Sequence, residues 1–290
     1  MDPARIHLVT FATRRFRLRQ QLLGLSARWN DVVDNVCEWS PERLQREGFA
    51  SRAPAIDLGE RGAGFWAWKP FIIEKMLQCV PDGDIVFYCD VGRMYPIKLL
   101  DTPITHFLDW MDERDYPVMP GLEIPWSGPM SVWTKRDAFV ALDQDTEESH
   151  SASPIQASFS VWRGGREARE IAKEWMDCCA QRELVSDDLS QSGVAELEGF
   201  RGHRHDQSLL TLCCLRRGIS GITVPSPLDG ATSRHPSEIV RILKGDSGYH
   251  TRSAAGKLLA QSSLMVACVE RSIRRVITFG EKQKDGIPAA

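Results

Sequence analysis

The chain has 290 residues, a net charge of −3 at pH 7, 42% hydrophobic residues and 26% charged residues. This composition is typical of a soluble globular protein with one large core, and without a basic surplus we expect no nucleic-acid partner. No apolar run reaches the roughly 18 residues of a membrane span, and the N-terminal segment lacks the apolar core of a secretory signal. We therefore expect a cytoplasmic protein whose adjacent cysteine pairs, at 178–179 and 213–214, act as small apolar residues.

The first ninety residues predict an alternation of strands and helices. Short apolar runs bounded by turn residues predict three strands, at 6–10, 35–39 and 85–89. The third run is continuously apolar, which is typical of a strand buried on both faces. Leucines indicate a helix over 14–29, and Pro70 suits the first turn of a helix that continues to Val80. The glycines of 50–64 indicate a loop.

The alternation continues to about residue 224. Further patterns predict helices and short strands at 102–111, 116–119, 166–182, 206–218 and 222–224. Alternating side chains over Gln156–Trp162 predict a half-buried strand, and Thr134 to Asp137 resembles a capping box with Asp in place of the usual Glu. We expect most of five tryptophans to lie in the core, namely Trp66, Trp68, Trp126, Trp133 and Trp162.

This order of elements favours an α/β protein with helices covering the faces of a sheet. The pattern changes after Pro227, where strand signals cease and one long helix is predicted over 254–279. We therefore divide the chain into a main domain at 1–230 and a helical C-terminal extension at 231–290. The basic end of that helix makes peripheral contact with an anionic membrane a hypothesis, second to packing on its own domain.

Several polar residues fall where strands or helices end, which is where α/β proteins bind ligands. Asp90 follows the buried strand, where it suits a metal ion or a ribose hydroxyl or, equally, closes a turn, and Gly92 lets a ligand approach the backbone. Lys69 precedes Pro70 at a helix start, a good place for a phosphate contact, with a solvated lysine as the alternative. Thr13 either meets a nucleotide or caps a helix.

A polar turn, His203 to Ser208, precedes the last apolar helix. Asp206 is a good N-cap residue, but capping leaves two histidines, an arginine and a glutamine unexplained. Imidazole binds divalent ions, and Asp206 with Gln207 can hold sugar hydroxyls or stabilise a developing cation. The HxHD order is similar to the HxHxDH motif of metallo-hydrolases, but it is one residue short and lacks the final His.

Three segments, GFWAWKPFIIEKML, DGDIVFYCDVG and HRHDQSLLTL, resemble the GYWxWKP, DGDxxxYxDxG and HRHDQS blocks of a family of bacterial GT-A-type nucleotide-diphospho-sugar transferases. The similarity covers about residues 5 to 225, in the same order. The resemblance implies a GT-A-like fold, a Rossmann-like mixed sheet with helices on both faces that holds an activated sugar at its carboxyl edge. It also makes 1–230 a glycosyltransferase domain, associated with surface polysaccharide synthesis.

A more distant similarity to glycogenin-like and mannosyltransferase-like families suggests roles for single residues. It implies that Lys69 contacts the donor, and that Asp90-Val91-Gly92 stands in the DxD position. Because Gly92 replaces the second acidic residue, a requirement for Mn²⁺ or Mg²⁺ is left open, with Asp90 and His205 as candidate ligands. His205 could instead contact phosphate. Asp206 and Gln207 are similar to a catalytic Asp-Gln pair near the sugar.

We therefore predict that Lys69, Asp90 and Asp206 converge on one cleft. The predicted activity is transfer of a sugar from a nucleotide-sugar donor to a glycan or lipid-linked acceptor, in the cytoplasm or peripherally at the inner membrane. Two alternatives stay open. One is a metal-dependent hydrolase built on His203, His205 and Asp206, and the other is a non-catalytic module that binds a sugar nucleotide without turnover.

Overall fold

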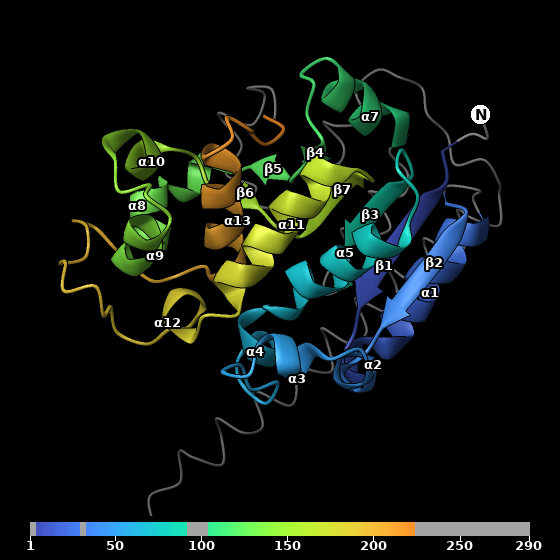
Figure 1. The fold of residues 1–290 in the computed structure, drawn as a ribbon, viewed down its shortest axis with the longest axis horizontal. Helices are drawn as coiled ribbons and strands as arrows, with labels where there is room; N and C mark the ends of the chain where they lie inside the picture. Colours follow the sequence, from blue (N-terminus) through green and yellow to red (C-terminus); the bar gives the residue numbers. More distant parts are fainter. Residues whose placement is uncertain (1–3, 30–32, 92–103, 224–290) are drawn as a thin grey trace, which may run out of the picture.

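The computed structural model describes residues 4–29, 33–91 and 104–223. Gly92 and the expected C-terminal extension, 231–290, lie outside these described residues. The described chain is a mixed α/β structure in which helices flank both faces of a five-stranded sheet (Figure 1). None of its described helices combines the length and the hydropathy that crossing a bilayer requires.

The central sheet has the order β2-β1-β3-β7-β4. Its strands are β1 (Ile6–Phe11), β2 (Asn35–Trp39), β3 (Ile85–Cys89), β4 (Val118–Met119) and β7 (Phe159–Arg163). Strand β1 pairs in parallel with β2 and β3, whereas β7 runs antiparallel to β3 and β4. A second, two-stranded sheet pairs β5 (Leu122–Glu123) with β6 (Ile155–Gln156). The strand expected at 222–224 is reduced to a bridge between Ile222 and Leu122.

Five longer helices carry the packing: α1 (Arg17–Trp29), α5 (Trp68–Cys79), α7 (Ile104–Asp112), α11 (Arg166–Cys179) and α13 (His205–Leu215). The short helices are η1 (Arg14–Phe16), α2 (Pro41–Arg46), α3 (Phe49–Arg52), α4 (Gly62–Phe65), η2 (Pro125–Ser127), α8 (Met130–Trp133), α9 (Arg136–Ala141), α10 (Glu147–Ser151) and α12 (Arg182–Val185). The sequence therefore predicted the five longer helices and the strands β1, β2 and β3 with small shifts at their ends. The single strand expected over Gln156–Trp162 is instead divided between β6 and β7, which belong to different sheets.

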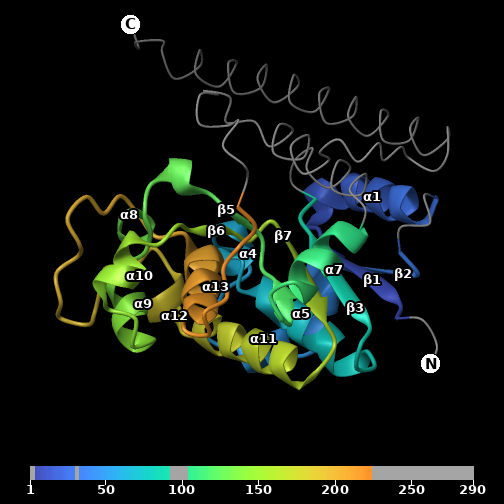
Figure 2. The same cartoon turned by 90° about the horizontal axis from the view of Figure 1, so that it is seen from above.

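Strand β3 explains the two-layered core. Its side chains alternate, so Val86 and Tyr88 enter one hydrophobic cluster while Ile85 and Phe87 enter the other. Helices α5, α11 and α13 belong to the first cluster, and α1 and α7 belong to the second. Figure 2 shows the sheet between these helices from above. All five residues of β3 are buried, which confirms the strand expected to be covered on both faces.

Strand β7 corrects the prediction of a half-buried strand. Ser160 and Trp162 are as deeply buried as their neighbours, because helix α11 covers the face that the pattern assigned to solvent. Trp162 stacks on Trp175 of α11 at 6.2 Å and donates its indole N–H to Ser160 Oγ at 2.7 Å. Ser160 can therefore face the core, because it accepts a hydrogen bond from the buried Trp162, although serines on alternate positions indicate a solvated face.

The tryptophans and the cysteines give opposite outcomes. The expectation that most tryptophans are core residues is wrong, since only Trp68 and Trp162 of the five are buried, while Trp126 is exposed. Trp66 and Trp133 are half-buried. The described cysteines are free thiols, and both adjacent pairs, at 178–179 and 213–214, are buried as small apolar residues.

The expected capping box at Thr134 to Asp137 is also wrong. Lys135 occupies the N-cap position of α9, and no side chain caps the helix there. Asp137 instead accepts hydrogen bonds from Ser190 Oγ and from the backbone N–H groups of Gln191 and Ser192. Burial opposes ionisation of Asp137, but these donors lower its pKa to about 2. This carboxylate holds a loop in place rather than a helix end.

Candidate functional site

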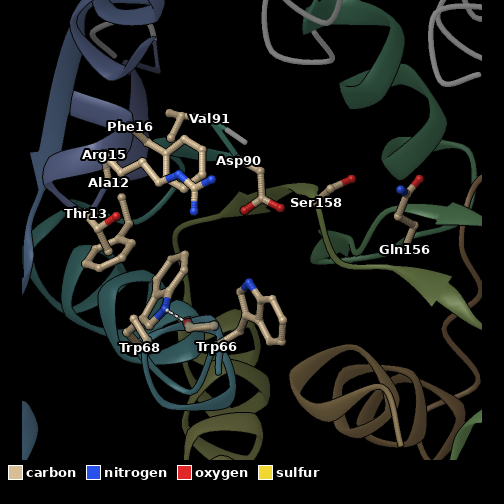
Figure 3. A pocket seen from close by; sticks show the side chains of 13 residues that line it. Ala12, Thr13, Arg15, Phe16, Trp66, Trp68, Asp90, Val91, Gln156 and Ser158 are labelled. Atoms are coloured by element: carbon tan, nitrogen blue, oxygen red, sulfur yellow. Dashed lines mark hydrogen bonds between the residues drawn. The ribbon is translucent and has the colours of Figure 1, made fainter. Parts of the chain in front are cut away.

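Two adjoining cavities lie at the edge of the sheet where β1 and β3 end. The larger has a volume of about 550 Å³, and Figure 3 shows side chains lining it from three directions, with Thr13 and Arg15 on one side and Asp90 facing Trp66 and Trp68. The smaller, of about 290 Å³, is lined by Lys69 and by the first turn of α13. They share four lining residues, namely Trp66, Asp90, Gln156 and Ser158, and so form one continuous cleft.

Lys69 lines the smaller cavity, next to Asp90, which both cavities share. Its Nζ lies 2.8 Å from Asp206 Oδ2 and 3.9 Å from Asp90 Oδ1, and it donates to the carbonyl oxygen of Ala157 at 2.9 Å. The prediction that Lys69, Asp90 and Asp206 converge is therefore confirmed, although the three residues come from three separate segments.

The surroundings of Lys69 change its expected role. Only 3% of the residue is exposed, which excludes the solvated lysine considered as an alternative, and its ammonium already has protein partners rather than lying open to a phosphate. Burial disfavours the charge, but the carboxylates of Asp206 and Asp90 outweigh it and raise the pKa of Lys69. Lys69 is thus a permanent cation that holds two carboxylates at one point.

Asp206 does not serve as the N-cap that its position indicated. Arg204 stands at the N-cap of α13, and Asp206 lies in the first turn with its carboxylate beside Lys69. Burial raises the pKa of Asp206 from 3.8 to about 6, against the opposing effect of Lys69. A carboxylate that costs this much to ionise, and that lines a cavity, is a functional candidate rather than a stabilising one.

Asp90 is the accessible member of the cluster, with a third of its side chain exposed. Its Oδ1 accepts a hydrogen bond from the hydroxyl of Tyr88, and its backbone N–H donates to the carbonyl oxygen of Ser158 at 2.8 Å. Burial first, and the charge of Asp90 second, raise the pKa of Tyr88 well above its usual range. Tyr88 therefore stays a neutral donor that fixes the direction of the Asp90 carboxylate.

A left-handed turn forms the wall between the two cavities. Residues Gly62 to Trp66 have φ values of 65°, 57°, 84°, 53° and 60° in succession. Gly62 and Gly64 are required there, because a Cβ would lie 2.5 Å from the ring of Trp66 and 2.6 Å from Ile56 Cγ2. For the three other residues the left-handed conformation costs roughly 1–2 kcal/mol each.

Aromatic contacts hold that turn in its strained form. Trp68 donates its indole N–H to the carbonyl oxygen of Gly62 at 2.9 Å and stacks on Phe11 at 4.0 Å. Trp66 stacks on His205 at 5.4 Å, and His205 itself has a φ of 51°. Strain of this kind concentrates where a site must hold one conformation, and here it lies at the cleft.

The two histidines do not form the metal centre considered from the sequence. His205 Nδ1 donates to the carbonyl oxygen of Val185 at 2.8 Å, and His203 Nδ1 accepts from the backbone N–H of Lys135 at 3.3 Å. Burial lowers the pKa of both rings, which are therefore neutral. Their Nδ1 atoms are occupied by hydrogen bonds to backbone groups. The carboxylate of Asp187 lies 3.5 Å from His205 Nε2.

A metal pair of Asp90 and His205 fits this arrangement poorly. Within the described segments, no three residues of the ligating types lie close enough to hold an ion. Asp90 is instead beside an ammonium group, which is an unfavourable neighbour for a divalent cation. The ring of His205 stacks on Trp66, and His205 lines the smaller cavity.

Thr13 and Gln207 both reach the cleft. Thr13 lines the larger cavity and stands at the N-cap of η1 without making a capping hydrogen bond. Gln207 lines the smaller cavity, where its buried Nε2 has no partner among the described residues. The hydroxyl of Ser158 is buried and unpartnered in the same sense. Buried polar atoms are normally paired, and a polar ligand in the cleft would supply a partner for these two.

Sequence reasoning missed Arg15, Tyr88 and Ser158. Tyr88 had a readable signal, because the period of a strand places residues 88 and 90 on one face. Arg15 follows Thr13 by two residues beyond β1, which was a weaker signal. Ser158 could not be found, because it reaches the cleft only through the antiparallel placement of β7 beside β3.

Sequence comparisons find neither a family model nor a curated protein that matches this chain. A function for this chain is therefore inferred from the geometry of the cleft.

Proposed function

We propose that the protein is a glycosyltransferase with a GT-A-like fold, which moves a sugar from a nucleotide-sugar donor to a glycan or lipid-linked acceptor in surface polysaccharide synthesis. The observation that carries the proposal is the buried Lys69 ammonium between Asp206, in the smaller cavity, and Asp90, which both cavities share, on the carboxyl edge of a sheet. This edge is where α/β proteins bind nucleotides.

The larger cavity suits the nucleotide part of the donor. Phe16, Trp66 and Trp68 give it apolar aromatic surface, on which a flat base can stack. The guanidinium of Arg15 and the hydroxyl of Thr13 lie in the same cavity. An arginine is the side chain best suited to bidentate binding of phosphate oxygens, so Arg15 is the residue that we assign to the diphosphate.

The smaller cavity suits the transferred sugar. Loss of the diphosphate leaves positive charge on the anomeric carbon of the sugar, and a fixed carboxylate beside that carbon stabilises the charge. We assign this role to Asp206, which Lys69 holds in one position, and the role of binding sugar hydroxyls to Gln207 and Asp90. Lys69 lets the two carboxylates share a site, because it offsets the repulsion between them.

A binding assay combined with a turnover assay tests the proposal. Full-length protein is screened for thermal stabilisation by UDP-, GDP-, CMP- and dTDP-sugars, each with and without Mn²⁺. We expect one nucleotide class to raise the melting temperature, as saturating ligand stabilises by about 2.7 kcal/mol at a hundred times Kd. The same donor should release its nucleotide diphosphate when an acceptor extract is added.

A matched pair of variants controls that screen. Lys69→Met should lose the stabilisation by donor, and Lys173→Met should keep it, because Lys173 is an exposed lysine that only pairs with Asp177 within its own helix. Stabilisation without turnover by any acceptor would support the non-catalytic module instead. Release of free sugar without any acceptor would support the hydrolase, and no response to any sugar nucleotide would overturn the proposal.

A further inference from the structure

The outer face of helix α1 combines exposed leucines with arginines. Leu18 and Leu25 are 53% and 47% exposed, and Arg17, Gln21 and Arg28 are exposed along the same stripe at helical spacing. The opposite face is fixed in the second hydrophobic cluster through Leu23 and Ala27. The leucines of the outer face are therefore not needed for packing within the described chain.

The charge of this segment differs from that of the whole chain. Residues 14–28 contain five arginines and no acidic residue. The rest of the chain contains 31 basic and 39 acidic residues and is therefore net negative. Arg14 and Arg15 form the turn before α1, and Arg17 begins the helix. Cations at a helix N-terminus oppose the helix dipole. Arg17 has the carboxylate of Glu42 as an electrostatic neighbour, but the segment itself contains no acidic residue, so its surplus of positive charge suits an external anionic partner.

The sequence outside the described residues is a poor candidate for that partner. Residues 224–290 carry ten basic and six acidic residues, and 92–103 carry two basic and one acidic. Both segments have the same sign of charge as the arginine face. An extended anionic surface is its electrostatic complement, and two leucines about two helical turns apart add apolar anchors of the kind that enter a lipid interface.

We propose that η1 and α1 form a docking face for an anionic lipid surface, with Leu18 and Leu25 entering the headgroup boundary and Arg14, Arg17 and Arg28 contacting the lipid phosphates. Arg15 and Phe16 belong to the same segment and line the larger cavity. Docking on this face therefore places the cleft beside the membrane, where a lipid-linked acceptor is presented. The evidence for this docking face is its charge and its exposed leucines, and it does not depend on the reaction proposed for the cleft.

Vesicle flotation of the full-length protein tests this docking face. Vesicles of phosphatidylglycerol and phosphatidylcholine are compared with vesicles of phosphatidylcholine alone. We expect binding to the anionic vesicles only, with an affinity that declines as salt rises. Leu18→Glu with Leu25→Glu, and separately Arg17→Glu with Arg28→Glu, should each weaken binding by about tenfold or more, since each basic residue near such a surface contributes roughly 1 kcal/mol.

Matched controls carry the same chemical changes elsewhere. Leu189→Glu replaces a leucine that is 90% exposed, and Arg166→Glu replaces an arginine whose side chain is 91% exposed; neither should change flotation. Equal binding to both kinds of vesicle, or wild-type binding by the α1 variants, would overturn the proposal. So would a dimer that the leucine variants dissociate, because the face would then join two copies of the chain. Stabilisation by a soluble donor should be unchanged in all variants, which separates this proposal from the glycosyltransferase.

Discussion

Lys69 and Lys135 are buried to nearly the same extent, at 3% and 2% exposed, but they belong to different kinds of site. The ammonium of Lys69 lies against two carboxylates at the edge of a cavity. Lys135 donates to the backbone carbonyl oxygens of Asp188 and Ser186, at 3.2 and 3.5 Å. It lies next to Asp137, whose carboxylate anchors the following part of the same loop.

The pKa values of the two lysines shift in opposite directions. Burial lowers the pKa of Lys135, because the charges of neighbouring carboxylates, Asp137 and Asp188 first, compensate only in part for the loss of water. Lys69 has its pKa raised, because its two carboxylates outweigh the same cost. The comparison teaches that burial of a charged side chain does not by itself indicate a functional site. A functional site is indicated when the buried charge also lies against opposite charges beside a cavity. Substitutions at the two lysines can distinguish a functional buried lysine from a structural one.

The largest expected effect is that of Lys69→Met. The variant leaves the buried Asp206 carboxylate without its partner, which typically costs about 3–5 kcal/mol, and it should also abolish sugar transfer. Lys135→Met should cost less, roughly 1–3 kcal/mol for the carbonyl groups left without a donor, and should retain transfer. Urea unfolding and transfer assays on both variants check this, and equal loss of transfer in the two would remove the distinction between the sites.

The next effect is a dependence on pH. Since Asp206 has a pKa of about 6 in the folded protein and 3.8 ordinarily, the folded state binds this proton more tightly than the unfolded chain. The free energy of unfolding should therefore decline as pH rises from about 4 to 6, by up to roughly 3 kcal/mol. Transfer should rise over pH 5 to 7, as the carboxylate forms. Asp206→Asn should lose this part of the stability profile, and a persisting slope would assign it to another group.

Asp90→Asn should have an intermediate effect. The amide keeps the shape of the side chain and can still accept the hydrogen bond from Tyr88, so the melting temperature should change little. It lacks the negative charge at the junction of the cavities, and transfer should decrease tenfold or more, on the order of 1.4 kcal/mol. Kinetics with saturating and limiting donor measure the loss. Normal turnover would make Asp90 a residue of the turn alone.

Ala63→Gly should have the smallest effect, and its sign is informative. Ala63 has a φ of 57° in the left-handed turn, where glycine avoids a cost of roughly 1 kcal/mol. Thermal unfolding should show a slightly more stable protein, although the greater freedom of glycine in the unfolded chain offsets part of the gain. A destabilised variant would show that the methyl group packs favourably enough to outweigh the strain.

Much of the fold was predictable because its signals are local. The run Ile85–Cys89 is apolar at every position, and the stripe after Pro70 has helical spacing, so β3 and α5 could be placed from the sequence. The strand over Phe159–Arg163 was misread in its burial, because which face is covered depends on where α11 packs. The periodicity of apolar residues indicates which secondary structure a segment prefers. It does not indicate which distant elements pack against that segment.

The sequence allowed most residues of the site to be predicted, but not the contacts between them. Lys69, Asp90 and Asp206 each stand near the end of an element, so a shared edge of the sheet was a reasonable inference. The ion pairs between them, which decide the role of Lys69, depend on the packing of α11 against both α5 and α13. The left-handed turn had a signal in Gly62 and Gly64, but Phe65 and Trp66 adopt it only because their rings are held by tertiary contacts.

Asp206→Asn, with melting temperature and sugar transfer measured on one preparation, tests the central claim most directly. Asparagine is nearly isosteric and removes a carboxylate whose ionisation is costly in the fold. Its amide oxygen can still accept from Lys69, and the Lys69 ammonium also keeps Asp90 and the carbonyl oxygen of Ala157 as partners. We therefore predict a melting temperature close to that of the wild type at pH 7, together with transfer reduced by about a hundredfold or more, as for the loss of one preorganised electrostatic group. Unchanged transfer at unchanged stability would contradict the account, because the carboxylate at the centre of the cleft would then have no part in the chemistry.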